Sequence, residues 1–283
     1  MKFKLSIITI NFNDKIGLRK TISSVVNQSF KDFEYIVIDG NSNDGSFDVI
    51  KEFKHDIQYW ISENDQGVYN AMNKGISVAR GDFLLFLNSG DSLIDEAILS
   101  KVVQELNDNI SIYYGNVLYS NNGKPVLLST PPKELTFSYF LNFSLPHPAS
   151  FIKKDLFSKY FYYNEHFKIV SDWEFFIYCI CKMNETYQHL DFVISDFDNG
   201  GISSSYLNKS LIIKEKKEIL LKHFPLFISD IKIIHDFKSS KNQKIKIIKT
   251  NKIKWKLLKI VIDMLTIFDK KTPSEHSKYY NKI

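Results

Sequence analysis

The sequence predicts an α/β fold in which a mainly parallel sheet is flanked by helices and followed by a basic helical C-terminal extension. Three observations support this prediction. Four short apolar runs near the N-terminus alternate with segments of helical periodicity, as in chains built from strand–helix–strand units. The first and fourth runs contain no charged residue, which is typical of strands buried on both faces of a parallel sheet. Lysine dominates the chain after about residue 207, and neither Gly nor Pro interrupts residues 239–271.

The first two strands are predicted by apolar, β-branched runs. Residues 5–10 read LSIITI, and residues 33–38 read FEYIVI. Between them, apolar side chains recur at helical spacing over residues 16–28. The segment NSNDGS then supplies turn-forming residues, and a helix over residues 46–54 follows. This order predicts two strand–helix units in succession.

The next strands complete the predicted parallel half. Residues 57–61 and 83–87 are the third and fourth strands, separated by a helix over residues 68–79. In the less regular second half, residues 112–119 read as a strand that turns at NNGK into a hairpin, and residues 192–195 form a last strand. We expect the third and fourth strands to extend the sheet begun by the first two.

Length and composition limit the class of protein. The 283 residues, 44% of them hydrophobic, suffice for one large domain with an appendage. We expect a domain over residues 1–206, with halves at about 1–95 and 96–206, and an extension over residues 207–283. A net charge of +5 is too small to indicate nucleic-acid binding.

Cysteine content and hydropathy suggest a compartment. The two cysteines, in the run YCICK, exclude a disulfide scaffold and a cysteine zinc site, and they fit buried free thiols in a reducing cytosol. The first apolar run is too short for a signal sequence, and no run of about 18 uncharged apolar residues indicates a transmembrane helix. We therefore expect a cytoplasmic protein.

Polar side chains stand where each predicted parallel strand ends. In open α/β sheets, ligands bind outside these carboxyl ends, so the residues there are candidate ligand contacts. Asp and Asn are also ordinary turn residues, but four such ends on one rim favour a binding site. The candidates are Thr9, Asn11, Asp39, Asp65, Asn88 and Asp91.

Four motifs at these ends resemble the family 2 glycosyltransferases. They are SIITINFND, EYIVIDGNSNDGS, SENDQGVYNAMNKGI and GDFLLFLNSGDSL, and they occur in the family's order. The resemblance covers about residues 4–205. It implies a GT-A fold and an inverting transfer of sugar from a nucleotide-sugar donor. Within the family, the third motif resembles bacterial transferases of surface-polysaccharide and lipopolysaccharide assembly.

The resemblance also implies roles for individual residues. Thr9 and Asn11 fall where the family contacts the nucleotide, and Asp39 falls where it holds the base or ribose. The donor pocket would be lined by Asp65 with Asn73 and Lys74 beside it, and by Asn88. The alternative for Lys74 is a solvated helix lysine.

The position of the family's D-x-D metal signature departs from its pattern. The stretch reads Asn88-Ser89-Gly90-Asp91, so Asp91 is its single carboxylate. The resemblance implies that Asp91 holds Mn²⁺ or Mg²⁺, with the donor diphosphate and water supplying the other ligands. His147, which two prolines are expected to hold in extended backbone, is a weak second candidate. The alternative for His147 is a structural role.

The general base implied by the family match is Asp172. Glu174 is the rival candidate. Two residues that are two positions apart on a helix face different directions, so only one of these acids should point at the acceptor. The segment that carries both acids reads as a helix to about residue 182, with Ser171 or Asp172 as its cap. A single base suffices for one inverting displacement.

The predicted function is transfer of a hexosyl or N-acetylhexosaminyl group from a nucleoside-diphosphate sugar, most simply a UDP-sugar. The acceptor would be a hydroxyl of a glycan or a lipid-linked glycan in surface-polysaccharide biosynthesis. The alternative is a non-catalytic GT-A-fold scaffold at the membrane surface, which only the thinned metal signature favours.

The C-terminal extension has two interpretations. Residues 253–268 predict an amphipathic helix with Trp255 and several lysines, a pattern typical of peripheral membrane contact. Such contact would place the protein at the inner face of the cell membrane. The other interpretation is a helix packed on the domain with its lysines in solvent.

Overall fold

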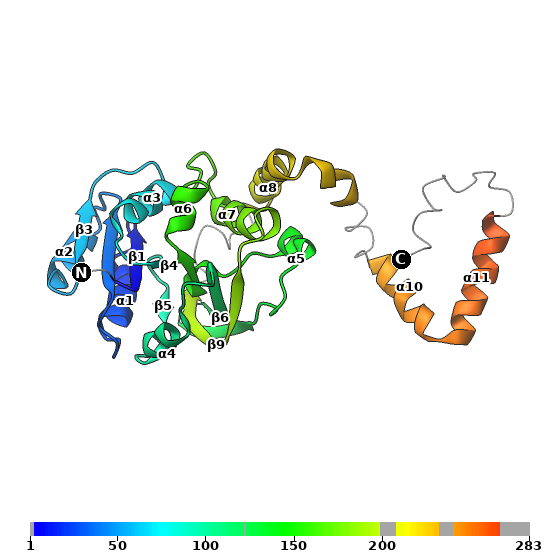
Figure 1. Ribbon diagram of the computed structural model, residues 1–283, viewed down its shortest axis with the longest axis horizontal. Helices are drawn as coiled ribbons and strands as arrows, with labels where there is room; N and C mark the ends of the chain where they lie inside the picture. The colour runs from blue at the N-terminus through cyan, green and yellow to red at the C-terminus, as the bar shows by residue number, and fades with distance from the viewer. Residues whose placement is uncertain (1–2, 122, 199–207, 232–239, 267–283) are drawn as a thin grey trace. The chain divides into compact units, whose positions relative to one another are not determined.

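The computed structural model describes residues 3–121, 123–198, 208–231 and 240–266. Within them, nine strands form one sheet in the order β3-β2-β1-β4-β8-β6-β9-β5, with β7 paired to β6. Helices cover both faces of this sheet (Figure 1). The strands are β1 (Leu5–Asn11), β2 (Glu34–Asp39), β3 (Tyr59–Ser62), β4 (Phe83–Phe86), β5 (Ser92–Leu93), β6 (Ile112–Asn121), β7 (Lys124–Ser129), β8 (Ser150–Lys153) and β9 (Tyr187–Asp198).

The first four strands form the parallel part of the sheet. β1 pairs in parallel with both β2 and β4, and β2 pairs in parallel with β3. Their register aligns the polar strand ends, because Asn11 lies opposite Asp39 and Asp39 lies opposite Ser62. The predicted α/β fold with a mainly parallel sheet is confirmed in this half.

The second half of the sheet is mixed. β8 runs antiparallel to both β4 and β6, whereas β9 runs parallel to β6 with register shifts near Gly115 and Asn116. The predicted hairpin between β6 and β7 is confirmed, whereas the last strand is longer than the expected residues 192–195. This arrangement brings the end of β9 back toward the N-terminal half, where β9 pairs with the short β5.

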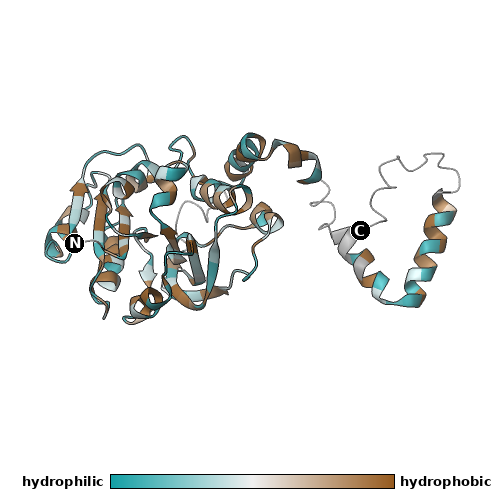
Figure 2. Ribbon diagram, in the orientation of Figure 1, coloured by the Kyte–Doolittle hydropathy of each residue, from teal (hydrophilic) through white to brown (hydrophobic). Residues whose placement is uncertain are grey.

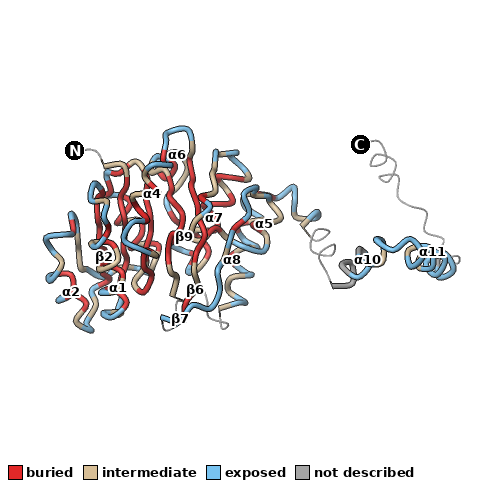
Figure 3. Tube along the Cα trace, turned by 90° about the horizontal axis from the view of Figure 1, so that it is seen from below, coloured by how far each residue is buried: buried red, intermediate tan, exposed pale blue. Residues whose placement is uncertain are grey.

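The continuous apolar strands divide their side chains between two cores. Ile8 and Leu84 join the core under α3 (Val68–Val78), α6 (Asp155–Lys159) and α7 (Ser171–Ile177). Ile7 and Leu85 join the other core, under α1 (Lys15–Val26), α2 (Ser46–Glu52) and α4 (Ile98–Glu105). Because successive side chains point to opposite faces of a sheet, a strand covered on both sides carries apolar residues on both of its faces. Figure 2 shows these strands as hydrophobic, and Figure 3 shows them as buried.

Several local predictions need correction. The chain around His147 is a single 3-10 turn, His147–Ala149, and not extended backbone. Neither Ser171 nor Asp172 caps α7; Val170 occupies the cap position, while the Ser171 hydroxyl accepts a hydrogen bond from the Asn164 amide. The predicted helix to residue 182 changes after α7 into a π-helical turn, Tyr178–Lys182.

Three short helices, α4, α5 (Phe137–Asn142) and α6, lie where no element was predicted. α5 and α6, with six and five residues, contain too few helical turns for a clear apolar periodicity. In α4 the buried Ile98, Leu99 and Val102 do follow helical spacing, so its signal is present in the sequence. Both cysteines are free thiols, with Cys179 buried and Cys181 half-buried.

The chain divides into two compact units, Met1–Phe224 and Pro225–Ile283. The first unit includes α8 (Lys209–His223), so it extends past the boundary expected at residue 206. The second contains a 3-10 turn (Pro225–Phe227), α10 (Ser240–Thr250) and α11 (Lys252–Thr266). Among the described residues, no helix has both the length and the apolar character needed to span a bilayer.

Candidate active site

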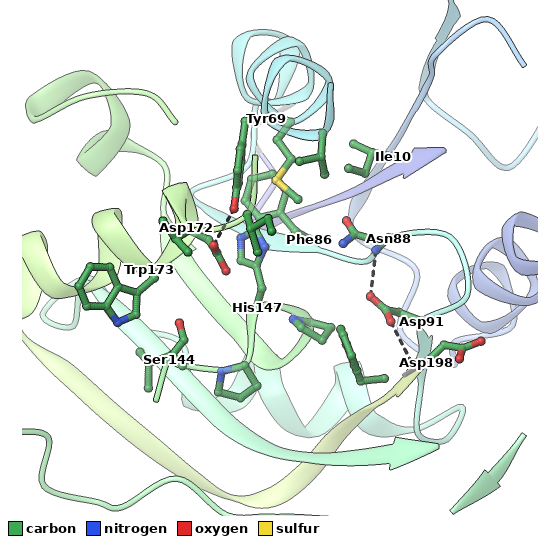
Figure 4. Close-up of a pocket in the computed structure, with 18 of the residues that line it drawn as sticks. Ile10, Tyr69, Phe86, Asn88, Asp91, Ser144, His147, Asp172, Trp173 and Asp198 are labelled. Carbon is green, nitrogen blue, oxygen red and sulfur yellow. Dashed lines mark hydrogen bonds between the residues drawn. The ribbon is translucent and has the colours of Figure 1, made fainter. Parts of the chain in front are cut away.

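A large cavity opens at the carboxyl ends of β1 and β4 in the first unit. Its volume is about 1420 Å³. Ligand pockets commonly measure roughly 300–1,000 Å³, so this cavity has room for more than one small molecule. Figure 4 shows Asn88 and Asp91 on one side of it and Asp172 and Trp173 on the other. The candidate residues that line it are Asn11, Asp65, Asn88, Asp91, His147 and Asp172.

The loop that carries Asn88 and Asp91 is fixed by α1. The buried Thr21 hydroxyl donates to the Asp91 carbonyl at 2.6 Å and accepts from the Gly90 amide at 3.1 Å. Lys20 Nζ donates to the Gly90 carbonyl at 2.8 Å. Within the loop, Asp91 Oδ2 accepts from the Asn88 amide at 3.1 Å, which closes the turn. These bonds hold the loop before any ligand binds.

Asp91 is not the lone carboxylate that the local sequence indicates. Asp198, at the end of β9, donates its backbone N–H to Asp91 Oδ1 at 3.2 Å. Burial raises the pKa of Asp91 to about 7, and the charge of Asp198 adds to the rise. Backbone hydrogen bonds and the ammonium of Lys20 act in the opposite direction. Both residues line the cavity, so Asp198 adds a second negative charge near the buried Asp91 carboxylate.

The chemistry of this corner fits a hard divalent cation. Asn88, whose backbone N–H binds Asp91, also lines the cavity, and its Oδ1 is buried without a hydrogen-bond partner in the described part of the chain. Carboxylate and amide oxygens are the ligands that Mg²⁺ and Mn²⁺ prefer. Within the described ranges, no cluster of three or more His, Cys, Asp or Glu side chains is present. Asp91, Asp198 and Asn88 would thus supply a partial shell that substrate or water must complete.

Asp39 forms the centre of a buried network behind the cavity. Its Oδ1 accepts from Asn11 Nδ2 at 2.7 Å and from the Ser42 hydroxyl at 2.6 Å. Its Oδ2 accepts from the Ser42 amide at 3.0 Å and from the Ser62 hydroxyl at 2.6 Å. A carboxylate has about four acceptor sites, and protein donors fill all four. Direct contact with a nucleotide, which stays a prediction, would require one of these bonds to be exchanged.

Asn11 connects that network to the metal-signature loop. Its Oδ1 accepts from the Ser89 hydroxyl at 2.7 Å, while its Nδ2 binds Asp39. The ends of β1, β2 and β4 are therefore joined by side chains as well as by the sheet. Asp65, which also lines the cavity, accepts from the Gly67 amide at 2.9 Å and fixes the turn before α3.

Three further candidates lie outside the lining set. The buried Thr9 hydroxyl shares a hydrogen bond with the Tyr35 hydroxyl at 3.0 Å. Asn73 pairs with the Tyr163 backbone through both its amide oxygen and its amide nitrogen. Lys74 Nζ lies 2.8 Å from a carboxylate oxygen of Glu63. The structure does not bring these side chains to the cavity, and their donor-binding roles stay predictions.

The two candidate bases point in different directions. Asp172 lines the cavity, and its Oδ1 accepts a hydrogen bond from the Tyr69 hydroxyl at 2.8 Å. Glu174 is fully buried, and its Oε1 lies 2.6 Å from His223 Nε2 and 3.1 Å from Lys222 Nζ. Only Asp172 is therefore positioned to meet a substrate, while Glu174 attaches α8 to α7.

His147 lies between the two sides of the cavity. Its ring stacks on Phe86 at 4.7 Å between centroids, and its Nε2 is 2.9 Å from the Tyr163 hydroxyl. Burial lowers its pKa, against the opposing charge of Asp172. A neutral imidazole with one nitrogen already bound to a tyrosine fits the structural role. Its role as a metal ligand stays a prediction.

Helix α8 completes the cavity wall, which the sequence did not indicate. Ile212 and Lys216 from this helix line the cavity. Glu215, next to them, accepts from the amides of Lys168 and Ile169 at 2.9 and 3.2 Å and fixes the segment that leads into α7. The sequence does not single out Lys216, because one lysine that faces inward in a lysine-rich helix resembles its solvated neighbours.

The family model for glycosyl transferase family 2 matches residues 6–165, which is more than half of the chain. The chain belongs to this family. The family 2 chain is 27% identical over 73% of its length to a PGL/p-HBAD biosynthesis glycosyltransferase of Mycobacterium bovis, 82% of which is covered. It is 38% identical over 42% of its length to a GalNAc(5)-diNAcBac-PP-undecaprenol beta-1,3-glucosyltransferase of Campylobacter jejuni, 40% of which is covered. The protein is therefore a glycosyltransferase.

Solved structures show that this family 2 glycosyltransferase has the GT-A fold. TarS of S. aureus in complex with UDP-GlcNAc matches with a TM-score of 0.62 and 18% identity, over 78% of this chain and 68% of that one. In the UDP complex of TarS the TM-score is 0.58 with 19% identity, over 69% of this chain and 60% of that one. The mannosyltransferase PcManGT of Pyrobaculum calidifontis, with GDP-Man and Mn²⁺, matches with a TM-score of 0.56 and 12% identity, over 81% of this chain and 65% of that one. The chain thus spans less than two thirds of two of these three solved chains.

Proposed function

We propose that the protein is an inverting glycosyltransferase that moves a hexosyl or N-acetylhexosaminyl group from a nucleoside-diphosphate sugar to an acceptor hydroxyl. The observation that carries this proposal is the placement of two kinds of acid in one cavity. The Asp91–Asp198 pair lies on one side, and Asp172 lies on the other (Figure 4). This separation suits a reaction in which negative charge leaves on one side and a proton is removed on the other.

The donor would bind on the Asp91 side. Asn88 Oδ1 and the carboxylates of Asp91 and Asp198 would hold Mn²⁺ or Mg²⁺, as their oxygen chemistry allows. When bound, such an ion offsets the charge that develops on a leaving diphosphate. The ring of Phe12 lines the cavity and is 67% exposed, so it offers an apolar face to a nucleobase. UDP-sugars are the first donors to test, because a related GT-A structure holds UDP-GlcNAc.

The acceptor hydroxyl would meet Asp172. The Tyr69 hydroxyl donates to Oδ1 and fixes the carboxylate, which leaves Oδ2 to accept the proton of the attacking hydroxyl. As the oxygen–carbon bond forms, the bond to the leaving diphosphate breaks, and the proton ends on Asp172. One displacement from the opposite face inverts the anomeric centre, so no second carboxylate nucleophile is required.

Substitution of Asp172 by asparagine tests this assignment. The variant keeps the size of the side chain and the contact with Tyr69 but removes the base. A well-placed general base contributes roughly 10²–10⁴-fold, so kcat should fall by about that factor while the affinity for UDP is unchanged. Asp32→Asn, at an exposed position, is the matched control. Near-full transfer by Asp172→Asn, with donor binding intact, would remove Asp172 from this role.

A place in surface-polysaccharide biosynthesis, with a glycan or lipid-linked acceptor, is the pathway we propose. It is supported by the relative whose name specifies an undecaprenol-diphosphate acceptor. A mass-spectrometric screen of nucleotide sugars against a pool of lipid-linked and free glycan acceptors would identify both substrates. Turnover of no nucleotide sugar with any acceptor, with and without Mn²⁺, would contradict the proposed activity and favour a non-catalytic scaffold.

We further propose that α11 brings the enzyme to the inner face of the cytoplasmic membrane. Its side chains include the exposed Ile253, Leu257 and Leu265, and Figure 2 shows hydrophobic and hydrophilic residues interspersed along it. Lys249 and Lys259 lie 5.0 and 5.5 Å from the Trp255 ring. Exposed apolar residues with lysines and tryptophan suit an anionic lipid surface.

A further inference from the structure

A lysine on the Asp172 side of the cavity has no role in the proposed reaction. Lys216, from α8, lines the cavity, and its Nζ lies 4.5 Å from the centroid of the Trp173 ring. In the described part of the chain, this ammonium makes no hydrogen bond or ion pair. An ammonium carries three donors, so Lys216 can hold a ligand without giving up a protein contact.

A second unused polar group belongs to the same wall. The Ser144 hydroxyl is buried and has no hydrogen-bond partner among the described residues. Figure 4 shows Ser144 on the same side of the cavity as Trp173, away from Asn88 and Asp91. Buried hydroxyls are nearly always hydrogen-bonded in native proteins, so an unpaired one beside a cavity indicates a missing ligand or water.

Trp173 connects these two groups. Its Nε1 donates to the carbonyls of Phe140 and Phe143 at 2.7 and 3.1 Å, which fixes the segment immediately before Ser144. Its ring face receives the ammonium of Lys216. The indole is 2% exposed and so cannot move aside easily. One rigid ring therefore positions both a hydroxyl and a cation.

The surroundings of Lys216 favour an anionic ligand. Burial lowers the pKa of its ammonium to about 8, and the charge of Asp172 partly opposes this shift. The neighbouring lining residues Ile212 and Val170 are apolar, so water screens the ammonium charge poorly. A poorly solvated cation without a bound counter-ion regains its lost solvation energy when an anion binds.

We propose that Lys216 and Ser144, held by Trp173, form a subsite for a negatively charged group of the acceptor, a phosphate or a carboxylate close to the reacting hydroxyl. This inference rests on the proposed function, because Asp172 marks the acceptor side. The donor diphosphate is assigned to the other side of the cavity, near Asp91. The enzyme would therefore select acceptors by charge as well as by sugar.

The test compares acceptors that differ in the charged group they carry. Three synthetic acceptors are built on the sugar found in the substrate screen: an undecyl glycoside, the corresponding glycosyl undecyl diphosphate, and the undecyl glycuronide, in which C6 of that sugar is a carboxylate. KM and kcat are measured for full-length protein and for Lys216→Met, which keeps the length of the side chain. Lys216→Arg restores the charge, and Lys217→Met removes an exposed lysine from the same helix. Ser144→Ala tests the hydroxyl independently.

Lys216→Met removes a hydrogen-bonded charge pair with the acceptor. KM for the preferred charged acceptor should therefore rise by roughly 10–100-fold. KM for the neutral glycoside and for the donor should stay within about twofold, and Lys216→Arg should recover most of the loss. The diphosphate and the glycuronide distinguish phosphate from carboxylate. Equal effects on neutral and charged acceptors, or a rise in donor KM alone, would overturn the inference while leaving the transferase activity intact. Transfer to none of the acceptors by the unmodified protein, with no donor hydrolysis, would overturn the proposed function as well.

Discussion

Replacement of Asp91 by asparagine should change how the stability of the metal-free protein depends on pH. The carboxyl group is 3% exposed, and its pKa is raised from an ordinary value of 3.8 to about 7 by burial. Between these two values the unfolded chain has lost the proton while the folded chain still holds it. The unfolded state therefore binds fewer protons, and stability falls as pH rises through this window. Across the whole window, ionisation of Asp91 lowers the free energy of unfolding by roughly 4 kcal/mol, at about 1.4 kcal/mol for each pH unit.

Urea unfolding in EDTA, at several pH values from about 5 to about 8, measures this contribution. The unmodified protein should lose stability more steeply than Asp91→Asn as pH rises, and Asp32→Asn should follow the unmodified protein. A cation that binds the ionised carboxylate acts in the opposite direction, so Mn²⁺ at about 100 times its Kd should restore about 2.7 kcal/mol. Parallel pH curves for the unmodified protein and Asp91→Asn, or equal stabilisation of both by Mn²⁺, would refute the reasoning.

Three further changes test other parts of the molecule. Phe12→Ala should weaken UDP binding roughly tenfold in calorimetry, because base stacking contributes about 1–3 kcal/mol, and an unchanged Kd would exclude stacking. His223→Ala should lower the free energy of unfolding by about 2 kcal/mol in urea, since it removes a 2.6 Å contact to the buried Glu174 carboxylate. The exposed His55→Ala is its control, and equal losses would contradict the role of the pair. Charge reversal of the α11 lysines should weaken the free energy of binding to anionic vesicles by roughly 1 kcal/mol per lysine, as measured by co-sedimentation. Undiminished binding would argue against membrane attachment.

The sequence predicts much of the Asp91 side of the cavity, because the topology of the sheet brings those residues together. In a parallel sheet all carboxyl ends meet at one edge, so polar residues after each apolar run must lie near one another. Asn11, Asp65, Asn88 and Asp91 line one cavity for this reason. The same logic does not reveal which strand-end residues face the ligand. Asp39 ends its strand as expected, but hydrogen bonds from three neighbouring side chains and one amide enclose it.

The other side of the cavity depends on contacts that no local pattern encodes. Lys216 reaches the cavity because Glu215 and His223 dock α8 onto the first unit, and the sequence shows only another lysine-rich helix. The choice between Asp172 and Glu174 depends on which face of α7 is covered. The helix α8 covers the Glu174 face, so Asp172 is left facing the cavity.

The glycine at position 90 also determines where the second acid must come from. Its φ of +98° is one that side-chain-bearing residues rarely adopt, and a Cβ there would lie 3.3 Å from the Cβ of Asp198. A carboxylate at position 90 is therefore disfavoured by its backbone conformation and by the close approach of Asp198, the residue that provides an acid from β9. The two acids lie 107 positions apart in the chain, so they meet only once the whole sheet has closed. A fragment that ends before β9 would keep all four sequence motifs and yet lack half of the acidic pair. Cation affinity in this enzyme should therefore report complete folding of the domain, which a cation site made from adjacent residues could not do.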